Sequence, residues 1–198
     1  MRLFLIIFIM ICRFLVFLFP IKFLFKVGRA LGLLCYYFIP KRRRITLINL
    51  KLCFPELSDK RRKKLAKKCF QNMGLGLFEA LCAWFKPKSA LFKLKLKIIN
   101  DNYLDNAREN KRGMMFLCGH ITCVEIVAQL LKKHYELNFI YRPHENIYID
   151  NLISKGRQRF GHKVIARDNI RQMLKCLKNA DYMINLLDQD MGIENSSF

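Results

Sequence analysis

The chain begins with its longest apolar stretch. Residues 3–19 read LFLIIFIMICRFLVFLF, with Arg13 as the one charged residue, and apolar residues continue to Ile39 between scattered cations. A helix that spans a membrane needs about 20 mainly apolar residues. Residues 3–25 therefore predict one spanning helix, with the Lys22 ammonium reaching toward the lipid headgroups.

Two other interpretations of this leader stay open. A cleaved signal peptide would end at a pair of small residues, and no such site follows the apolar stretch. A helix lying in the headgroup region would also combine phenylalanine with interspersed cations. The basic run 41–44 (KRRR) comes next, and the positive-inside rule puts it and the following residues in the cytoplasm. This run either sets only the topology or also attracts anionic lipid headgroups.

Two helices are predicted before Pro87. Residues 45–54 have helical apolar spacing and end before Pro55. Ser58 and Asp59 begin the second helix, which joins the basic stretch 60–68 to a largely apolar continuation over residues 72–85. Such a helical layer fits either a membrane surface or ordinary core packing.

From residue 91 onward, strand patterns alternate with helix patterns. Residues 91–99 alternate apolar residues with lysine, which is the period of a half-buried strand. Further strands are predicted at residues 114–118, 137–141, 163–166 and 182–187, and helices at residues 103–110, 123–133 and 147–160. Asp168 is predicted to cap a last helix with an inner face of Ile170, Met173, Leu174 and Leu177. This order predicts an α/β protein with a layered α/β/α domain.

The charge of the chain limits its partners. Lysine and arginine number 36 against 15 acidic residues, so the formal net charge is +21. Such an excess favours nucleic acid, an anionic membrane, or an acidic carrier with a phosphorylated substrate. We expect a membrane and no nucleic acid, because the strongest basic run follows an apolar leader and no nucleic-acid motif accompanies it. Eight cysteines without a C-x-x-C pair predict reduced, mostly buried thiols and no metal site.

The segment 118–125 (CGHITCVE) carries the candidate chemistry. His120 follows a predicted strand and a glycine, and Glu125 opens the next predicted helix. Positions five apart on one helix point about 140° away from each other, so the two side chains meet only if His120 lies in the turn. In that geometry a carboxylate orients a general base. The alternative is a capping box, in which Thr122 caps the helix and Glu125 reaches back to its N–H. The other histidines, at 134, 144 and 162, are expected to be solvated.

Four stretches in this order resemble the lipid A late acyltransferases, the Kdo-lipid IVA lauroyl/myristoyl transferase family. The first is the leader with its basic run and residues 48–56 (INLKLCFPE). The others are Gly119-His120 with Glu125, Tyr141-Arg142-Pro143 with Asn146, and Asp188-Gln189-Asp190-x-Gly192 before residues 196–198. The histidine–acid motif alone is shared with glycerolipid acyltransferases, whereas the ordered set is more specific and covers essentially the whole chain.

The resemblance implies transfer of a fatty acyl chain from acyl carrier protein to a hydroxyl of a lipid A precursor, an anionic acylated glucosamine disaccharide. It implies His120 as the general base and Glu125 as the group that orients it, without a metal, a cofactor or a covalent enzyme intermediate. Arg142 and Arg167 are expected to bind substrate phosphate or the developing oxyanion. Asp190 is expected to position a substrate or catalytic group.

The resemblance also implies a place in the cell and a division of the chain. Residues 1–40 would be the anchor in a bacterial inner membrane, and residues 41–198 a cytoplasmic acyltransferase domain. Family members continue past Phe198, so we expect a truncated chain with an incomplete sheet. Two alternative functions are a glycerolipid acyltransferase that acts on lysophospholipid, and an inactive remnant that only associates with membrane or with a complementary fragment.

Overall fold

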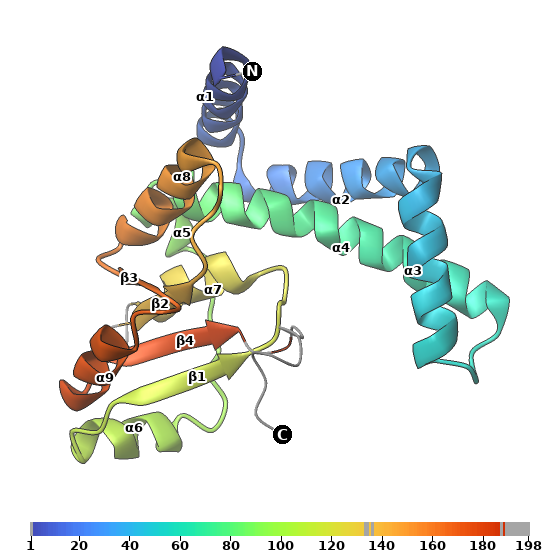
Figure 1. The fold of residues 1–198 in the computed structure, drawn as a ribbon. Helices are drawn as coiled ribbons and strands as arrows, with labels where there is room; N and C mark the ends of the chain where they lie inside the picture. Colours follow the sequence, from blue (N-terminus) through green and yellow to red (C-terminus); the bar gives the residue numbers. More distant parts are fainter. Residues whose placement is uncertain (1, 133–134, 136, 187, 189–198) are drawn as a thin grey trace. The chain divides into compact units, whose positions relative to one another are not determined.

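The chain folds into two compact units, Met1–Leu91 and Phe92–Phe198. The computed structural model describes residues 2–132, 135, 137–186 and 188 (Figure 1). The predicted division at residue 40, between a membrane anchor and an acyltransferase domain, stays a prediction.

The first unit is helical, and prolines mark its breaks. Its helices are α1 (Arg2–Leu18), α2 (Ile21–Phe38), α3 (Pro40–Cys53), α4 (Asp59–Phe85) and α5 (Lys88–Leu91). The prediction of one helix over residues 3–25 is wrong, because the chain leaves the helical conformation at Phe19 and Pro20. Proline has no N–H to donate and disfavours a helical conformation in the residue before it. Pro40 begins α3, five residues earlier than the apolar spacing predicted, since proline suits the first helical position.

In the described part of the chain, one bent pair of helices combines the length and the apolar composition of a membrane span. Among the described residues, no single helix is both long and apolar enough to cross a bilayer. The pair α2 and α3 passes the same test of length and composition when taken together, but the two helices bend by 94° at their junction. The predicted single-pass anchor is therefore not confirmed.

Helix α4 packs against α1, α2 and α3 in the helical unit. It runs unbroken from the basic stretch into the apolar one, as predicted, and the Ser58 hydroxyl accepts a hydrogen bond from the N–H of Arg61 at its start. At its other end, the buried Lys86 ammonium donates to the carbonyls of Phe17 (3.3 Å) and Phe19 (2.7 Å). Those carbonyls lie at the end of α1, where backbone acceptors lack helical partners. Lys86 thus ties α1 to α4.

Helices α2 and α4 touch through their backbones. A Cβ atom added to Gly32 would lie 2.1 Å from the carbonyl oxygen of Phe70, and one added to Gly74 would lie 2.2 Å from that of Gly28. Only glycine permits so close an approach, which is how helices pack where small residues line their interface. Beside this crossing, a small core joins α2, α3 and α4 through Tyr36, Leu50, Ala66 and Phe70.

The second unit is a parallel sheet with helices. Its strands are β1 (Met114–Cys118), β2 (Leu137–Tyr141), β3 (Lys163–Ala166) and β4 (Tyr182–Leu186), and its helices are α6 (Asn102–Glu109), α7 (Val124–Leu131), α8 (Ile147–Gln158) and α9 (Ile170–Lys178). All paired strands are parallel, in the order β1-β4-β2-β3. Strand β4 therefore lies between β1 and β2 (Figure 1).

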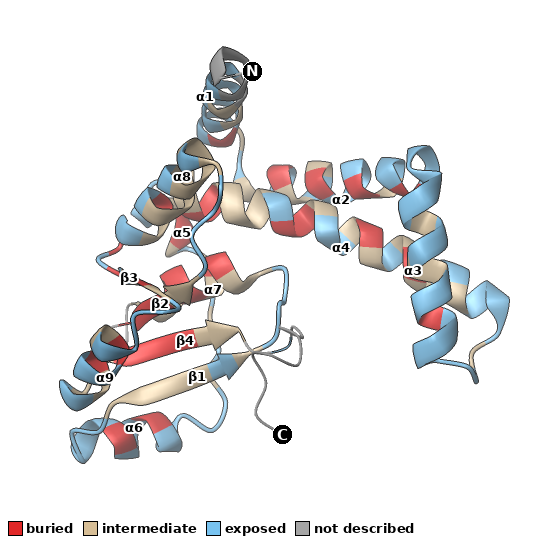
Figure 2. Ribbon diagram, in the orientation of Figure 1, coloured by how far each residue is buried: buried red, intermediate tan, exposed pale blue. Residues whose placement is uncertain are grey.

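Helices cover both faces of this sheet. On one face Leu104 of α6 and Ala128 of α7 pack with Phe139 of β2 and Ile184 of β4. On the other face Met173 and Cys176 of α9 pack with residues that include Ile165 and Met183. Figure 2 shows that buried residues make up much of β4. The predicted α/β class is confirmed.

Two local predictions in this unit are wrong. The strand predicted at residues 91–99 does not form, although half-buried and exposed positions alternate over residues 92–99. The alternation indicates an extended chain, but a strand also needs a partner for its backbone hydrogen bonds. Helix α9 is capped by Asn169, whose side chain accepts from the N–H of Gln172, rather than by Asp168. Its inner face holds Met173, Cys176 and Leu177, whereas Ile170 and Leu174 are exposed.

Candidate active site

The carboxyl ends of the parallel strands gather the candidate residues at one edge of the sheet. His120 lies shortly after β1 and Asp188 shortly after β4, while Arg142 and Arg167 directly follow β2 and β3. In open parallel sheets, ligands bind at this edge. The topology thus brings together side chains that are far apart in the sequence.

His120 is held by Asp188. The backbone N–H of His120 donates to Oδ2 of Asp188 at 2.8 Å, and the ring Nδ1 contacts Oδ1 of the same carboxylate. The two side chains are 40% and 47% exposed, so the pair is open to a substrate. A carboxylate at Nδ1 favours the tautomer that keeps the proton there and leaves the lone pair on Nε2. Because both His120 groups bond to the carboxylate, with the backbone N–H as the main cause, the pKa of Asp188 is lowered.

Glu125 lies in the first turn of α7 and bonds to Arg157 of α8. The Arg157 Nε donates to the two carboxylate oxygens at 3.0 and 3.3 Å, and a second guanidinium nitrogen also contacts the carboxylate. Both side chains are nearly buried, at 12% exposed for Arg157 and 10% for Glu125. The guanidinium also stacks over the ring of Phe139, 4.6 Å from its centroid. This buried ion pair locks α7 to α8.

The structure separates the pair that the motif suggested. Within the part of the chain that the structure describes, no hydrogen bond joins His120 to Glu125, because the first bonds to Asp188 and the second to Arg157. The capping box is wrong, since α7 has Cys123 as its N-cap and no side-chain cap hydrogen bond. The catalytic roles of His120 and Glu125 stay predictions, with Asp188 as the direct partner of the histidine.

The comparison with known proteins agrees with the resemblance. Residues 1–198 match the model of the bacterial lipid A biosynthesis acyltransferases. The chain belongs to this family. It is 31% identical to the lipid A biosynthesis lauroyltransferase of Escherichia coli strain K12 over 179 residues, which are 90% of this chain and 58% of that protein. The lipid A biosynthesis palmitoleoyltransferase of the same strain is 30% identical with the same coverage. The myristoyltransferase is 30% identical over 79% of this chain and 49% of its own length. The chain thus spans 58% or less of the length of these relatives.

Of the three residues predicted to bind substrate, the structure describes Arg142 and Arg167 but not Asp190. The side chains of Arg142 and Arg167 are exposed, and the backbone N–H of Arg167 donates to the carbonyl of Tyr141, which joins the ends of β3 and β2. Asp190 lies outside the described residues. The substrate-binding roles of all three stay predictions.

Sequence reasoning missed two residues, Asp188 and Arg157. Asp188 begins the Asp-x-Asp stretch of the family motif, but the sequence analysis assigned the positioning of a substrate or catalytic group to Asp190. Only the order of the strands shows that the residue after β4 faces the one after β1. Arg157 lies 32 residues from Glu125 in a helix with several cations, and no local signal distinguishes it from its neighbours.

The remaining histidines and thiols do not extend the site. His162 is buried rather than solvated, with its ring Nδ1 2.8 Å from the carbonyl oxygen of Leu137. All eight cysteines are free thiols. Only Cys82 and Cys176 are buried, four others are half-buried and two are exposed, contrary to the expectation of mostly buried ones. Burial raises the pKa of the Cys118 thiol, which disfavours it as a nucleophile. No group of acidic, histidine and cysteine side chains suited to a metal ion occurs among the described residues.

Proposed function

We propose that this chain carries the catalytic site of an acyltransferase that moves a fatty acyl chain from acyl carrier protein to a hydroxyl of a lipid A precursor. The family match supports acyl transfer, and the names of the relatives support lipid A as the product class. The observation that carries the proposal is the His120–Asp188 pair at the open edge of the sheet. It leaves Nε2 of the ring available to an acceptor hydroxyl.

The proposed reaction needs only these side chains and the two substrates. Nε2 of His120 takes the proton of the acceptor hydroxyl while the oxygen attacks the carbonyl carbon of the donor thioester. The tetrahedral intermediate then collapses, the carrier thiolate leaves, and the imidazolium returns the proton to that sulfur. Asp188 stabilises the imidazolium, as the carboxylate of a catalytic triad does. The step involves no metal, no further cofactor and no bond between enzyme and acyl group.

The charged residues around the pair have separate proposed roles. The buried Glu125–Arg157 pair fixes α7, which follows the turn that carries His120, so it positions the base. The exposed Arg142 and Arg167 bind the phosphates of the acceptor or the oxyanion. Asp190 orients the acceptor from the segment that follows β4.

The helical unit is proposed as the anchor in a bacterial inner membrane, with the α/β unit in the cytoplasm. Large apolar side chains such as Phe17 and Phe38 are exposed in this unit, and the basic run 41–44 follows α2. Soluble surfaces rarely expose so much apolar area, and a basic run favours the cytoplasmic side of a membrane.

The test uses membranes that contain the full chain, an acyl carrier protein loaded with a fatty acid, and a tetra-acylated lipid A precursor. His120→Ala is expected to lower the rate by about 10²- to 10⁴-fold, the usual contribution of a general base. His144→Ala is the control, because it removes another exposed histidine. Acylation of lysophospholipid in place of the disaccharide would make the proposed substrate wrong. Equal rates with the wild type and His120→Ala would make the proposed mechanism wrong.

A further inference from the structure

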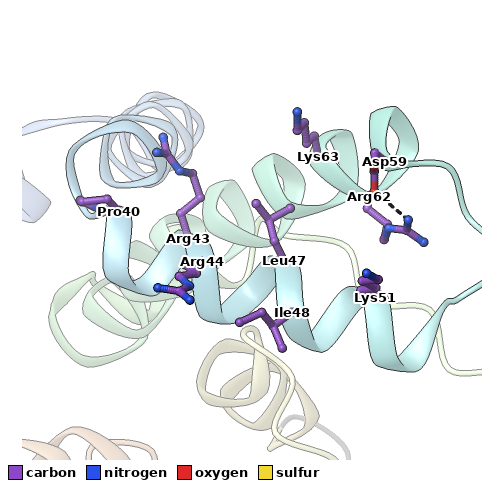
Figure 3. Close-up of a pocket in the computed structure, with 9 residues that line it drawn as sticks. All are labelled: Pro40, Arg43, Arg44, Leu47, Ile48, Lys51, Asp59, Arg62 and Lys63. Carbon is purple, nitrogen blue, oxygen red and sulfur yellow. Dashed lines mark hydrogen bonds and ion pairs between the residues drawn. The ribbon is translucent and has the colours of Figure 1, made fainter.

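A cationic cavity lies in the helical unit, which contains none of the residues of the proposed mechanism. It has a volume of about 580 Å³ and lies between α3 and the first turns of α4 (Figure 3). Five cationic side chains and one carboxylate line it. An excess of positive charge this large at a concave site favours an anionic ligand.

Two of the cations build the cavity wall. Arg62 donates to Asp59 at 2.7 Å and to the carbonyls of Phe54 and Pro55 at 3.2 Å each, so it holds the turn between α3 and α4. Arg43 donates to the carbonyl of Tyr36 at 3.5 Å and lies over its ring. These contacts preform the site and occupy its one carboxylate.

The other three cations have no such structural contacts. Arg44, Lys51 and Lys63 are exposed, and none of them forms a hydrogen bond or ion pair with another described residue. Guanidinium and ammonium groups are the usual ligands of phosphate oxygens. Three cations around one cavity thus attract a phosphate group and offer donors to its several acceptor oxygens.

Apolar side chains beside these cations indicate that the anion carries hydrocarbon. Leu47 and Ile48 line the cavity with the cations. Ile45, Ile48 and Leu52 follow the spacing of one helical face and are 42%, 48% and 75% exposed. A free phosphate ion would use none of this apolar surface, whereas the chains of a lipid would cover it.

We propose that this cavity binds the phosphodiester headgroup of an anionic glycerophospholipid, with the acyl chains along the exposed apolar face of α3. The site is formed by residues of the helical unit, whereas His120 and the other residues of the proposed mechanism belong to the α/β unit. It would select anionic lipid through specific contacts, in addition to the general attraction of a basic protein to a membrane.

The test compares two triple variants of the full chain in a neutral detergent. Arg44→Gln/Lys51→Gln/Lys63→Gln removes the three available cations of the cavity. Lys60→Gln/Arg61→Gln/Lys64→Gln removes the same charge from exposed positions of α4 that do not line the cavity. Native mass spectrometry measures the binding of phosphatidylglycerol and of phosphatidylcholine with the same acyl chains, and circular dichroism checks that both variants fold.

We expect the wild type to bind one phosphatidylglycerol in preference to phosphatidylcholine. The cavity variant should weaken that binding by about tenfold or more, because it loses three cations that attract the anionic headgroup. The α4 control should change the binding little. Equal weakening by both variants would show that lipid binding depends on the overall charge of the protein and not on the cavity, and would overturn the proposal. Equal binding of the two lipids, or displacement of phosphatidylglycerol by millimolar inorganic phosphate, would also overturn it.

Discussion

The two units of this chain treat apolar side chains in opposite ways. In the α/β unit, residues such as Leu137, Ile165 and Met183 are at most 1% exposed and form cores on both faces of the sheet. In the helical unit, Phe38 is 79% exposed and Leu52 is 75% exposed, and most of the exposed large apolar side chains of the described residues lie there (Figure 2). The α/β unit buries most of its large apolar side chains within itself, whereas the helical unit leaves many of its own exposed beside a small core.

This difference extends to how the helices are held. The α/β unit is stabilised by burial of side chains between helices and sheet, whereas α2 and α4 meet at glycines with their backbones in contact. Contact through small residues is the packing used where apolar burial in water does not drive association. Substitutions should therefore affect chemistry and a buried ion pair in the α/β unit, and the close packing of two helices in the helical unit.

The largest effect is expected at Asp188. Asp188→Asn removes the charge that stabilises the His120 imidazolium, so kcat/KM for the acceptor should fall by about 10²- to 10⁴-fold. The thermal midpoint should hardly change, because the Asp188 side chain is 47% exposed. Asp190→Asn is the matched control, since the sequence analysis expected Asp190 to position a substrate or catalytic group. A greater loss with Asp190→Asn than with Asp188→Asn would refute the assignment.

A large effect on stability is expected at Arg157. Arg157→Met leaves the nearly buried Glu125 without its main cation, and breaking a buried pair costs about 3–5 kcal/mol in the free energy of unfolding. Amide hydrogen exchange should show faster opening of α7 and α8. The double variant Glu125→Leu/Arg157→Met should recover much of the loss, because no charge is left buried. A double variant as unstable as the single one would show that packing of the Arg157 side chain, not its charge, holds these helices.

In the helical unit the expected effect is smaller and local. Gly32→Ala forces a methyl group against the carbonyl of Phe70, and overpacking of this kind costs about 1–3 kcal/mol. Hydrogen exchange should accelerate in α2 and α4 and stay unchanged in the sheet. The neighbouring Leu31→Ala, on an exposed position of α2, should change neither. Faster exchange throughout the sheet with Gly32→Ala would mean that the two units unfold together and would remove the contrast between them.

The sequence predicted the helices and strands better than it predicted which side chains contact each other. The strands β1 to β3 were predicted with their observed bounds, because each is a short apolar run between glycine, proline or charged residues. The strand predicted at residues 91–99 was wrong because period-two alternation indicates an extended chain but not the presence of a partner strand. In the site, His120 was predicted as a candidate because it follows the end of a strand and a glycine. Asp188 was missed because the insertion of β4 beside β1 is a property of the whole sheet that no local pattern encodes.

The smallest expected effect is the titration of Asp188. The backbone N–H of His120 and then its ring lower the pKa of this carboxyl from its usual 3.8. Its contribution to stability is therefore present above pH 3.8 and is lost as the pH falls through the lowered pKa of the folded state. Carbon-13 NMR of the labelled carboxyl should give a midpoint below 3.8 in the wild type. His120→Ala should raise that midpoint only in part, because the variant keeps the backbone N–H that contributes most. A full return to the usual value would assign the effect to the imidazole ring, and would make the ring rather than the turn after β1 the group that holds Asp188 in place.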